Sequence, residues 1–117
     1  MSIIHVNSDE EFVTVRQNFA PPYVIDFYAD WCGPCKVIAP SFEAIANELE
    51  DKATFVKINV DMFVNNDCMK KYNVRSIPTI LVLNDFEQAP TLTIVGMKTA
   101  AELTSKIRDE VEKLTNV

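Results

Sequence analysis

Residues 23–36 read Y-V-I-D-F-Y-A-D-W-C-G-P-C-K, an apolar run that leads into two cysteines spaced two residues apart. The run 23–29 is apolar at both odd and even positions, as in a strand covered on both faces. Pro34 suits the first turn of a helix. The stretch therefore predicts a buried strand followed by a helix with Cys32 at its N-cap. C-x-x-C in that setting indicates redox chemistry more strongly than the spacing alone.

The positions of the two cysteines assign them different roles. Residues i and i+3 share one face of a helix, so the sulfurs of Cys32 and Cys35 can meet. Unpaired backbone N–H groups and the helix dipole favour a thiolate at Cys32. Because the thiolate is the nucleophile in disulfide exchange, we expect Cys32, at the more exposed end, to attack. Cys35, one turn inside, would then resolve the mixed disulfide.

Two other uses of the pair fit less well. A zinc site needs four ligands, and beyond the pair the chain offers only a lone Cys68 and a lone His5, so no metal site is expected. A structural staple across so short a loop would remove little chain entropy. Cys68 itself is expected to be a buried, small apolar side chain in a stripe with Val64 and Tyr72.

Length and composition restrict the class of protein. The chain has 117 residues, enough for one domain over 1–117, and a net charge of −6, which does not fit a phosphate-backbone binder. Its apolar runs are too short to span a bilayer, so no membrane partner is expected. The first residues have neither a basic segment nor a long apolar one, so the expectation is a cytoplasmic protein without a signal peptide.

The remaining elements alternate along the chain. Ser8 and Thr99 each open a capping box, Pro40 should kink the long helix, and the last two strands should pair antiparallel. The order β-α-β-α-β-α-β-β-α predicts an α/β fold, a central mixed sheet of about five strands covered on both faces by about four helices. The predicted strands are 2–6, 23–29, 54–60, 77–83 and 91–95, and the predicted helices are 9–18, 34–50, 64–72 and 100 onward.

Apolar spacing predicts which side chains these helices bury. The long helix should bury Val37, Ile38, Phe42, Ile45, Ala46 and Leu49, and the last helix Leu103, Ile107, Val111 and Leu114. The segment 84–90 between the last two strands has no glycine for a tight turn, and its Phe86 is expected to be exposed.

Asp26 lies in the middle of an apolar strand, where a charge is costly. Either the strand lies at the surface with Asp26 facing water, or Asp26 is a buried acid with a raised pKa beneath the cysteines. In the second case it could exchange a proton with Cys35. Trp31 precedes the nucleophile and is expected at the surface beside it.

The segment D-F-Y-A-D-W-C-G-P-C-K, followed by R-S-I-P-T and then V-G, resembles the thioredoxin family over nearly the whole chain. The resemblance implies the thioredoxin fold and a small dithiol carrier that reduces protein disulfides. It also implies re-reduction by thioredoxin reductase with electrons from NADPH. No cofactor is expected in this chain, which lacks a nucleotide-binding glycine motif.

The resemblance also implies roles for individual residues. Asp26 would assist proton transfer, with Lys57 of the next strand nearby, although Lys57 could equally be an ordinary strand-end lysine. Pro78 would follow a cis bond and face the disulfide, whereas the sequence alone favours trans. Gly96 would belong to an apolar docking rim, although it could be a simple turn residue. That rim would consist of Trp31, Gly33, Pro34, Ile77, Pro78, Val95, Gly96 and Met97.

Two alternative functions remain at this point. One is a disulfide oxidant or isomerase on the same fold, which the Gly-Pro dipeptide between the cysteines argues against. The other is a non-catalytic subunit that uses the same surface for docking. A monomer is expected.

Overall fold

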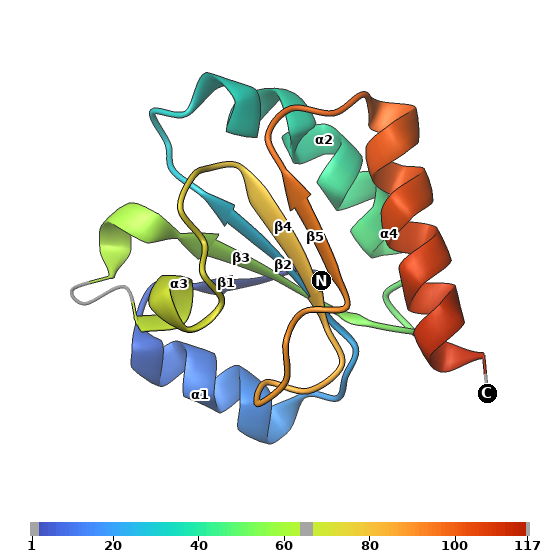
Figure 1. Ribbon diagram of the computed structural model, residues 1–117, viewed down its shortest axis with the longest axis horizontal. Helices are drawn as coiled ribbons and strands as arrows, with labels where there is room; N and C mark the ends of the chain where they lie inside the picture. The colour runs from blue at the N-terminus through green and yellow to red at the C-terminus, as the bar shows by residue number, and fades with distance from the viewer. Residues whose placement is uncertain (1–2, 64–66, 117) are drawn as a thin grey trace.

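The computed structural model describes residues 3–63 and 67–116 (Figure 1). Within them a five-stranded sheet is covered by helices on both faces, which confirms the predicted fold class. The elements are β1 (Ile3–Val6), α1 (Asp9–Asn18), β2 (Tyr23–Tyr28), α2 (Gly33–Glu48), β3 (Thr54–Asn59), η1 (Val60–Met62), α3 (Asp67–Lys71), β4 (Thr79–Leu83), β5 (Leu92–Val95) and α4 (Ala100–Thr115).

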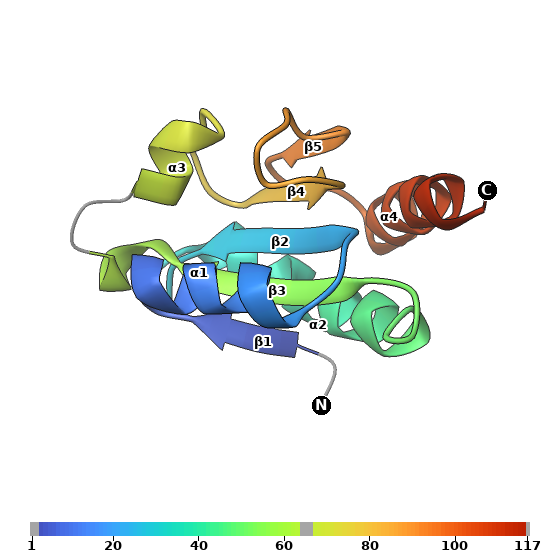
Figure 2. The same ribbon diagram turned by 90° about the horizontal axis from the view of Figure 1, so that it is seen from below.

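The strands lie in the order β1-β3-β2-β4-β5. β3 pairs in parallel with β1 and β2, whereas β4 is antiparallel to both β2 and β5. The sheet is therefore mixed, as predicted. Figure 2 shows α1 in front of the sheet and α2 behind it, and Figure 1 shows α3 on the side of α1 and α4 on the side of α2.

The central strand β2 contributes side chains to two separate cores, one on each face of the sheet. Ile25 and Phe27 pack with side chains of α1 and α3, whereas Val24 packs with side chains of α2 and α4. Because successive side chains of a strand point to opposite faces, Asp26 and Tyr28 lie on the face covered by α2. This alternation places Asp26 on the same side of the sheet as the cysteines.

Side-chain caps determine where α1 and α4 begin. The Ser8 hydroxyl accepts the Glu11 N–H at 3.1 Å, and the Glu11 carboxylate accepts the Asn7 N–H at 2.8 Å. The Thr99 hydroxyl accepts the Glu102 N–H at 3.1 Å. Both predicted helix starts are confirmed, since these bonds satisfy backbone donors that have no partner inside the helix.

Several predicted boundaries need correction. β4 begins at Thr79, after Pro78 rather than at Ile77, and α2 ends at Glu48. α2 continues through Pro40, and the expected kink there stays a prediction. The helix expected over 64–72 is observed over Asp67–Lys71, and its first three residues, like Ser2 of the first strand, lie outside the described residues.

Burial in the helices matches the prediction with one exception. Val37 is 60% exposed, because the spacing places Ile38 rather than Val37 toward the sheet. The other positions predicted on α2 are buried, as are Leu103, Ile107 and Val111 of α4, with Leu114 partly buried.

Phe86 is buried, and the expectation that it is exposed was wrong. It is only 4% exposed and contacts the rings of Phe12 and Tyr23, with centroids 4.9 Å and 4.2 Å away. The Tyr72 hydroxyl donates to the Phe86 carbonyl at 2.8 Å. The segment 84–90 therefore folds inward and closes the core between α1 and α3.

No helix within residues 3–63 and 67–116 is long and apolar enough to cross a membrane.

Candidate active site

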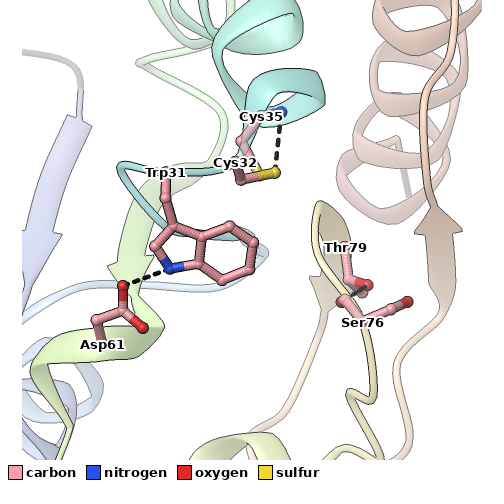
Figure 3. Close-up of a disulfide and its surroundings, with 6 residues drawn as sticks. All are labelled: Trp31, Cys32, Cys35, Asp61, Ser76 and Thr79. Carbon is pink, nitrogen blue, oxygen red and sulfur yellow. Dashed lines mark hydrogen bonds between the residues drawn. A yellow bond between two sulfur atoms is a disulfide. The ribbon is translucent and has the colours of Figure 1, made fainter.

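Cys32 and Cys35 form a disulfide at the start of α2, with Cα atoms 5.3 Å apart (Figure 3). Cys32 is the N-cap residue, as predicted, and its sulfur accepts the Cys35 N–H at 3.2 Å. This bond occupies one of the helix donors that lack a partner within the helix. Cys32 therefore lies where backbone N–H groups stabilise negative charge on sulfur.

Both cysteines are largely covered in this disulfide form. Each is 4% exposed, so Cys32 is no more accessible than Cys35, contrary to the expectation from helix position. The pair packs against Ala29, with Tyr28 and Ile77 also in contact with this cluster. The turn from β2 into α2 holds the sulfurs against these side chains, and the sequence did not predict that cover.

Asp26 is buried, so the surface-strand alternative is wrong. The residue is 1% exposed, and its Oδ1 atom has no hydrogen-bond partner among the described residues. Burial raises the pKa of this carboxyl to about 6, although Lys57 acts in the opposite direction. Loss of water penalises the charged form more than one lysine stabilises it.

Lys57 lies opposite Asp26 in the register of the parallel strands β2 and β3. The predicted proximity of the two residues is therefore confirmed. The Lys57 ammonium also lies 4.4 Å from the centre of the Tyr28 ring. Sequence reasoning missed Tyr28, although the alternation in D-F-Y places it on the same face as Asp26.

Trp31 is 70% exposed beside the disulfide, as expected. Its indole Nε1 donates to Oδ2 of Asp61 at 2.8 Å (Figure 3). Asp61 belongs to the short turn η1, which follows β3 and was not predicted. The two residues are thirty positions apart in the chain, so only the tertiary structure brings them together.

The segment around Pro78 lies across from the disulfide, as Figure 3 shows for Ser76 and Thr79. The Ile77–Pro78 bond is cis, as the resemblance implied and as sequence alone did not favour. Thr79 donates through its hydroxyl to the Ser76 carbonyl at 2.7 Å. This bond closes the turn that leads into β4.

Gly96 lies next to Pro78, since its N–H donates to the Pro78 carbonyl at 2.9 Å. Its φ of 82° lies in the region that other residues rarely adopt, so the backbone conformation favours glycine at this position. Val95 and Met97 on either side are 52% and 50% exposed.

Most of the predicted rim residues present accessible apolar surface, whereas Pro78 is buried. Gly33 and Pro34 are exposed, and Ile77 is half-buried against the cysteines. Met62, directly after Asp61, is 56% exposed and was missed by the sequence analysis. No pattern in the sequence marks this turn or its place beside the site, so no local signal could have found Met62.

The described residues hold no group of three or more His, Cys, Asp or Glu side chains placed to bind a metal ion. The groups that the site brings together are a disulfide that opens to two thiols, a buried carboxyl and a nearby ammonium.

A disulfide at the N-terminus of a helix, on the same face of the sheet as a buried acid, is typical of a thiol–disulfide oxidoreductase. Comparison with known proteins identifies the family within this class. The thioredoxin family model matches residues 3–109, so the chain belongs to the thioredoxin family.

Individual relatives agree with this assignment. A thioredoxin of Mycolicibacterium smegmatis is 40% identical over 102 residues, covering 87% of this chain and 89% of that protein. A thioredoxin of Haemophilus influenzae is also 40% identical, over 76% of this chain and 80% of its own. Among solved structures, a mutant thioredoxin of Halobacterium salinarum superposes with a TM-score of 0.77 at 28% identity, over 99% of this chain and 93% of that chain.

Proposed function

We propose that this protein is a dithiol electron carrier that reduces protein disulfides through Cys32 and Cys35. The observation that carries the proposal is the N-cap position of Cys32, whose sulfur accepts the Cys35 N–H at 3.2 Å. A sulfur in that position is stabilised as a thiolate when the disulfide opens. The Gly-Pro dipeptide of W-C-G-P-C supports reduction rather than oxidation or isomerisation.

In the first step, the Cys32 thiolate attacks one sulfur of a substrate disulfide. The substrate S–S bond breaks, its other sulfur leaves as a thiolate, and a Cys32–substrate mixed disulfide forms. Cys32 is well covered in the oxidised form, and reduction separates the two sulfurs.

In the second step, Cys35 loses its proton and attacks the Cys32 sulfur. The mixed disulfide breaks, the substrate leaves with both sulfurs reduced, and the Cys32–Cys35 disulfide re-forms. Asp26 suits the role of proton acceptor, because a pKa of about 6 lies close to neutral pH. The Lys57 ammonium favours the ionised form of Asp26, which is the form that can accept a proton.

Substrates would dock on the apolar rim around the disulfide. An extended peptide can pair with the backbone at Ile77, beside the cis bond to Pro78. Trp31, Val95 and Met97 provide exposed apolar surface around that position. Gly33 and Pro34, between the two cysteines, are themselves exposed and add to this docking surface.

The oxidised protein needs a partner that returns two electrons. We assign this task to thioredoxin reductase, with NADPH as the electron source, in the reducing environment of the cytoplasm. The protein would act as a monomer, since its apolar rim is needed for substrates.

The test is the reduction potential of the Cys32–Cys35 couple, measured by equilibration with a dithiol buffer. A couple more reducing than the glutathione pool, together with turnover of a protein disulfide, is the expected result. A potential at or above that of glutathione would make the protein an oxidant or isomerase. A Cys32→Ser, Cys35→Ser variant with full biological activity would favour a docking subunit instead.

A further inference from the structure

Four polar residues form a two-by-two patch on the face of the sheet that α2 covers. Asp26 and Tyr28 alternate along β2, and in the register of the parallel strands they lie opposite Lys57 and Asn59 of β3. Directly opposed residues of neighbouring strands point to the same side of a sheet. The site described above uses Asp26 and Lys57 and leaves Tyr28 and Asn59 without a role.

Tyr28 connects the two halves of this patch. The Lys57 ammonium lies 4.4 Å from the centre of the Tyr28 ring, within the range of a cation–π contact. The contact is diagonal: Lys57 lies directly opposite Asp26, but its ammonium lies over the ring of Tyr28, two residues further along β2. The Tyr28 side chain also packs against the cluster formed by the two cysteines and Ala29.

Asn59 lies opposite Tyr28 in the register of the two strands, and its Oδ1 atom accepts the Asp61 N–H at 3.1 Å. Burial raises the pKa of the Tyr28 phenol, and the nearby Asp30 and Asp26 raise it further, whereas Asn59 lowers it. The Tyr28 ring itself is held by its packing against the disulfide cluster.

We propose that Tyr28 is a positioning residue for the thiol–disulfide exchange: its ring, packed against the disulfide cluster, holds the Lys57 ammonium close to Asp26. Without the ring, the flexible lysine side chain extends into solvent and its ammonium becomes hydrated. Asp26 would then lose the nearby positive charge of Lys57, which favours its ionised form. The inference rests on the proposed role of Asp26 as the proton acceptor for Cys35.

Other titratable groups near the patch determine the design of the test. His5 lies opposite Lys57 on β1, so its imidazole belongs to the surroundings of the patch. Asp30 acts electrostatically on Tyr28. On the β4 side, Asp26 faces the apolar Ile80. The cysteines do not titrate while they are disulfide-bonded, so measurements on the oxidised protein exclude them.

The experiment follows the Asp26 carboxyl by ¹³C NMR between pH 4 and pH 9 in the oxidised protein. Tyr28→Leu removes the ring, whereas Tyr28→Phe keeps the ring and removes only the hydroxyl. We expect Tyr28→Leu to raise the Asp26 midpoint by about half a pH unit and Tyr28→Phe to leave it near that of the parent. Each variant is measured with and without His5→Gln, so that any influence of the neighbouring imidazole is separated from that of the Tyr28 ring.

A double-mutant cycle with Lys57→Met identifies the route of the effect. If the ring acts through the ammonium, Tyr28→Leu shifts the midpoint in the parent but not in the Lys57→Met background. An equal shift in both backgrounds would overturn the proposal, because the ring would then act on Asp26 directly, through solvent exclusion. A shift in Tyr28→Phe as large as that in Tyr28→Leu, or no shift in Tyr28→Leu, would overturn it as well.

A kinetic readout connects the titration to the reaction. The rate at which each reduced variant reduces a peptide disulfide is measured over the same pH range. We expect the acid side of this profile to move with the Asp26 midpoint in Tyr28→Leu and to stay in place in Tyr28→Phe. A parent protein that reduces no disulfide would contradict the proposed function, whereas the titration of the oxidised protein would still decide the role of Tyr28.

Discussion

Asp26 and Lys57 lie directly opposite each other on parallel strands, yet the pKa of the carboxyl is raised rather than lowered. A nearby ammonium alone would lower it. Burial prevails because Asp26 is 1% exposed and its Oδ1 atom has no partner among the described residues. The protein thus keeps a carboxyl that is costly to ionise on the face of the sheet that carries its disulfide, and this cost can be measured.

Replacing Asp26 with Asn should remove a pH-dependent loss of stability. The carboxyl pKa rises from 3.8 to about 6 on folding, so the native state binds the proton more tightly than the unfolded state. Stability from this group is present below pH 3.8 and is lost as the pH rises through 6. At pH 8 this group lowers the free energy of unfolding by about 3 kcal/mol relative to its value at strongly acidic pH.

Urea unfolding of the parent and of Asp26→Asn at pH 4 and pH 8 tests this prediction. The difference between the two proteins should change in favour of the variant by about 2.4 kcal/mol from pH 4 to pH 8, because at pH 4 the unfolded-state carboxyl is already partly ionised. Asp51→Asn, at an exposed position after α2, is the matched control. A difference that stays constant with pH would show that Asp26 is not buried in solution.

Replacing Phe86 with Ala should destabilise the protein without changing its redox chemistry. The ring contacts Phe12 and Tyr23 in the core, so its removal should cost about 3–5 kcal/mol. β4 and β2 are antiparallel, which places the 84–90 segment at the opposite end of β2 from the cysteines.

Thermal unfolding and the reduction potential should therefore respond differently to this substitution. The unfolding temperature should fall, while the potential and the rate of disulfide reduction at room temperature stay unchanged. Gln88→Ala, an exposed position in the same segment, should leave all three unchanged. A small loss in Phe86→Ala would indicate that the segment does not pack inward.

The two glycines provide a matched pair for substitution by alanine. A Cβ atom added at Gly33 or at Gly96 would meet no atom within 4 Å, so space is available at both. Only Gly96 has a positive φ, of 82°, and Gly96→Ala should cost about 1–2 kcal/mol from backbone strain. Gly33→Ala should change the free energy of unfolding by less than half of that, and equal costs in both variants would contradict the structure.

Cys68 should be the unreactive cysteine of the three. It is 4% exposed, and burial raises the pKa of its thiol to about 11. Because the thiolate is the reactive form, alkylation of the reduced native protein at pH 8 should label Cys32, at the helix N-cap, and spare Cys68. The unfolded protein should label at all three, and rapid labelling of native Cys68 would show that this part of the core opens readily.

Local patterns in the sequence predicted most of the elements. The apolar run of β2, the caps at Ser8 and Thr99, and the C-x-x-C spacing each depend on contacts within a few residues of the chain. Cys32 could be assigned to the helix N-cap for the same reason. The prediction failed at Val37, where burial depends on the rotation of α2 about its axis. It also failed at Phe86, where burial depends on the path of the 84–90 segment.

The candidate site was predicted less completely than the fold. Asp26 had two possible environments, because a sequence does not show which of two faces of a strand is solvated. Asp61 and Met62 were missed, since they lie in a turn that no pattern predicted. The resemblance to the thioredoxin family, rather than local residue chemistry, indicated the cis bond before Pro78 and the nearness of Lys57.

The sequence by itself determined the redox pair, the order of the elements and the alternation that places Asp26 and Tyr28 on one face of β2. These features follow from backbone geometry and from spacing along a single segment. Only the tertiary structure decided that Asp26 loses its water, that Trp31 bonds Asp61, and that the Lys57 ammonium lies over Tyr28. Solvent exclusion and contacts between distant segments depend on how the strands pair and on what covers them, and both exist only once the chain has folded.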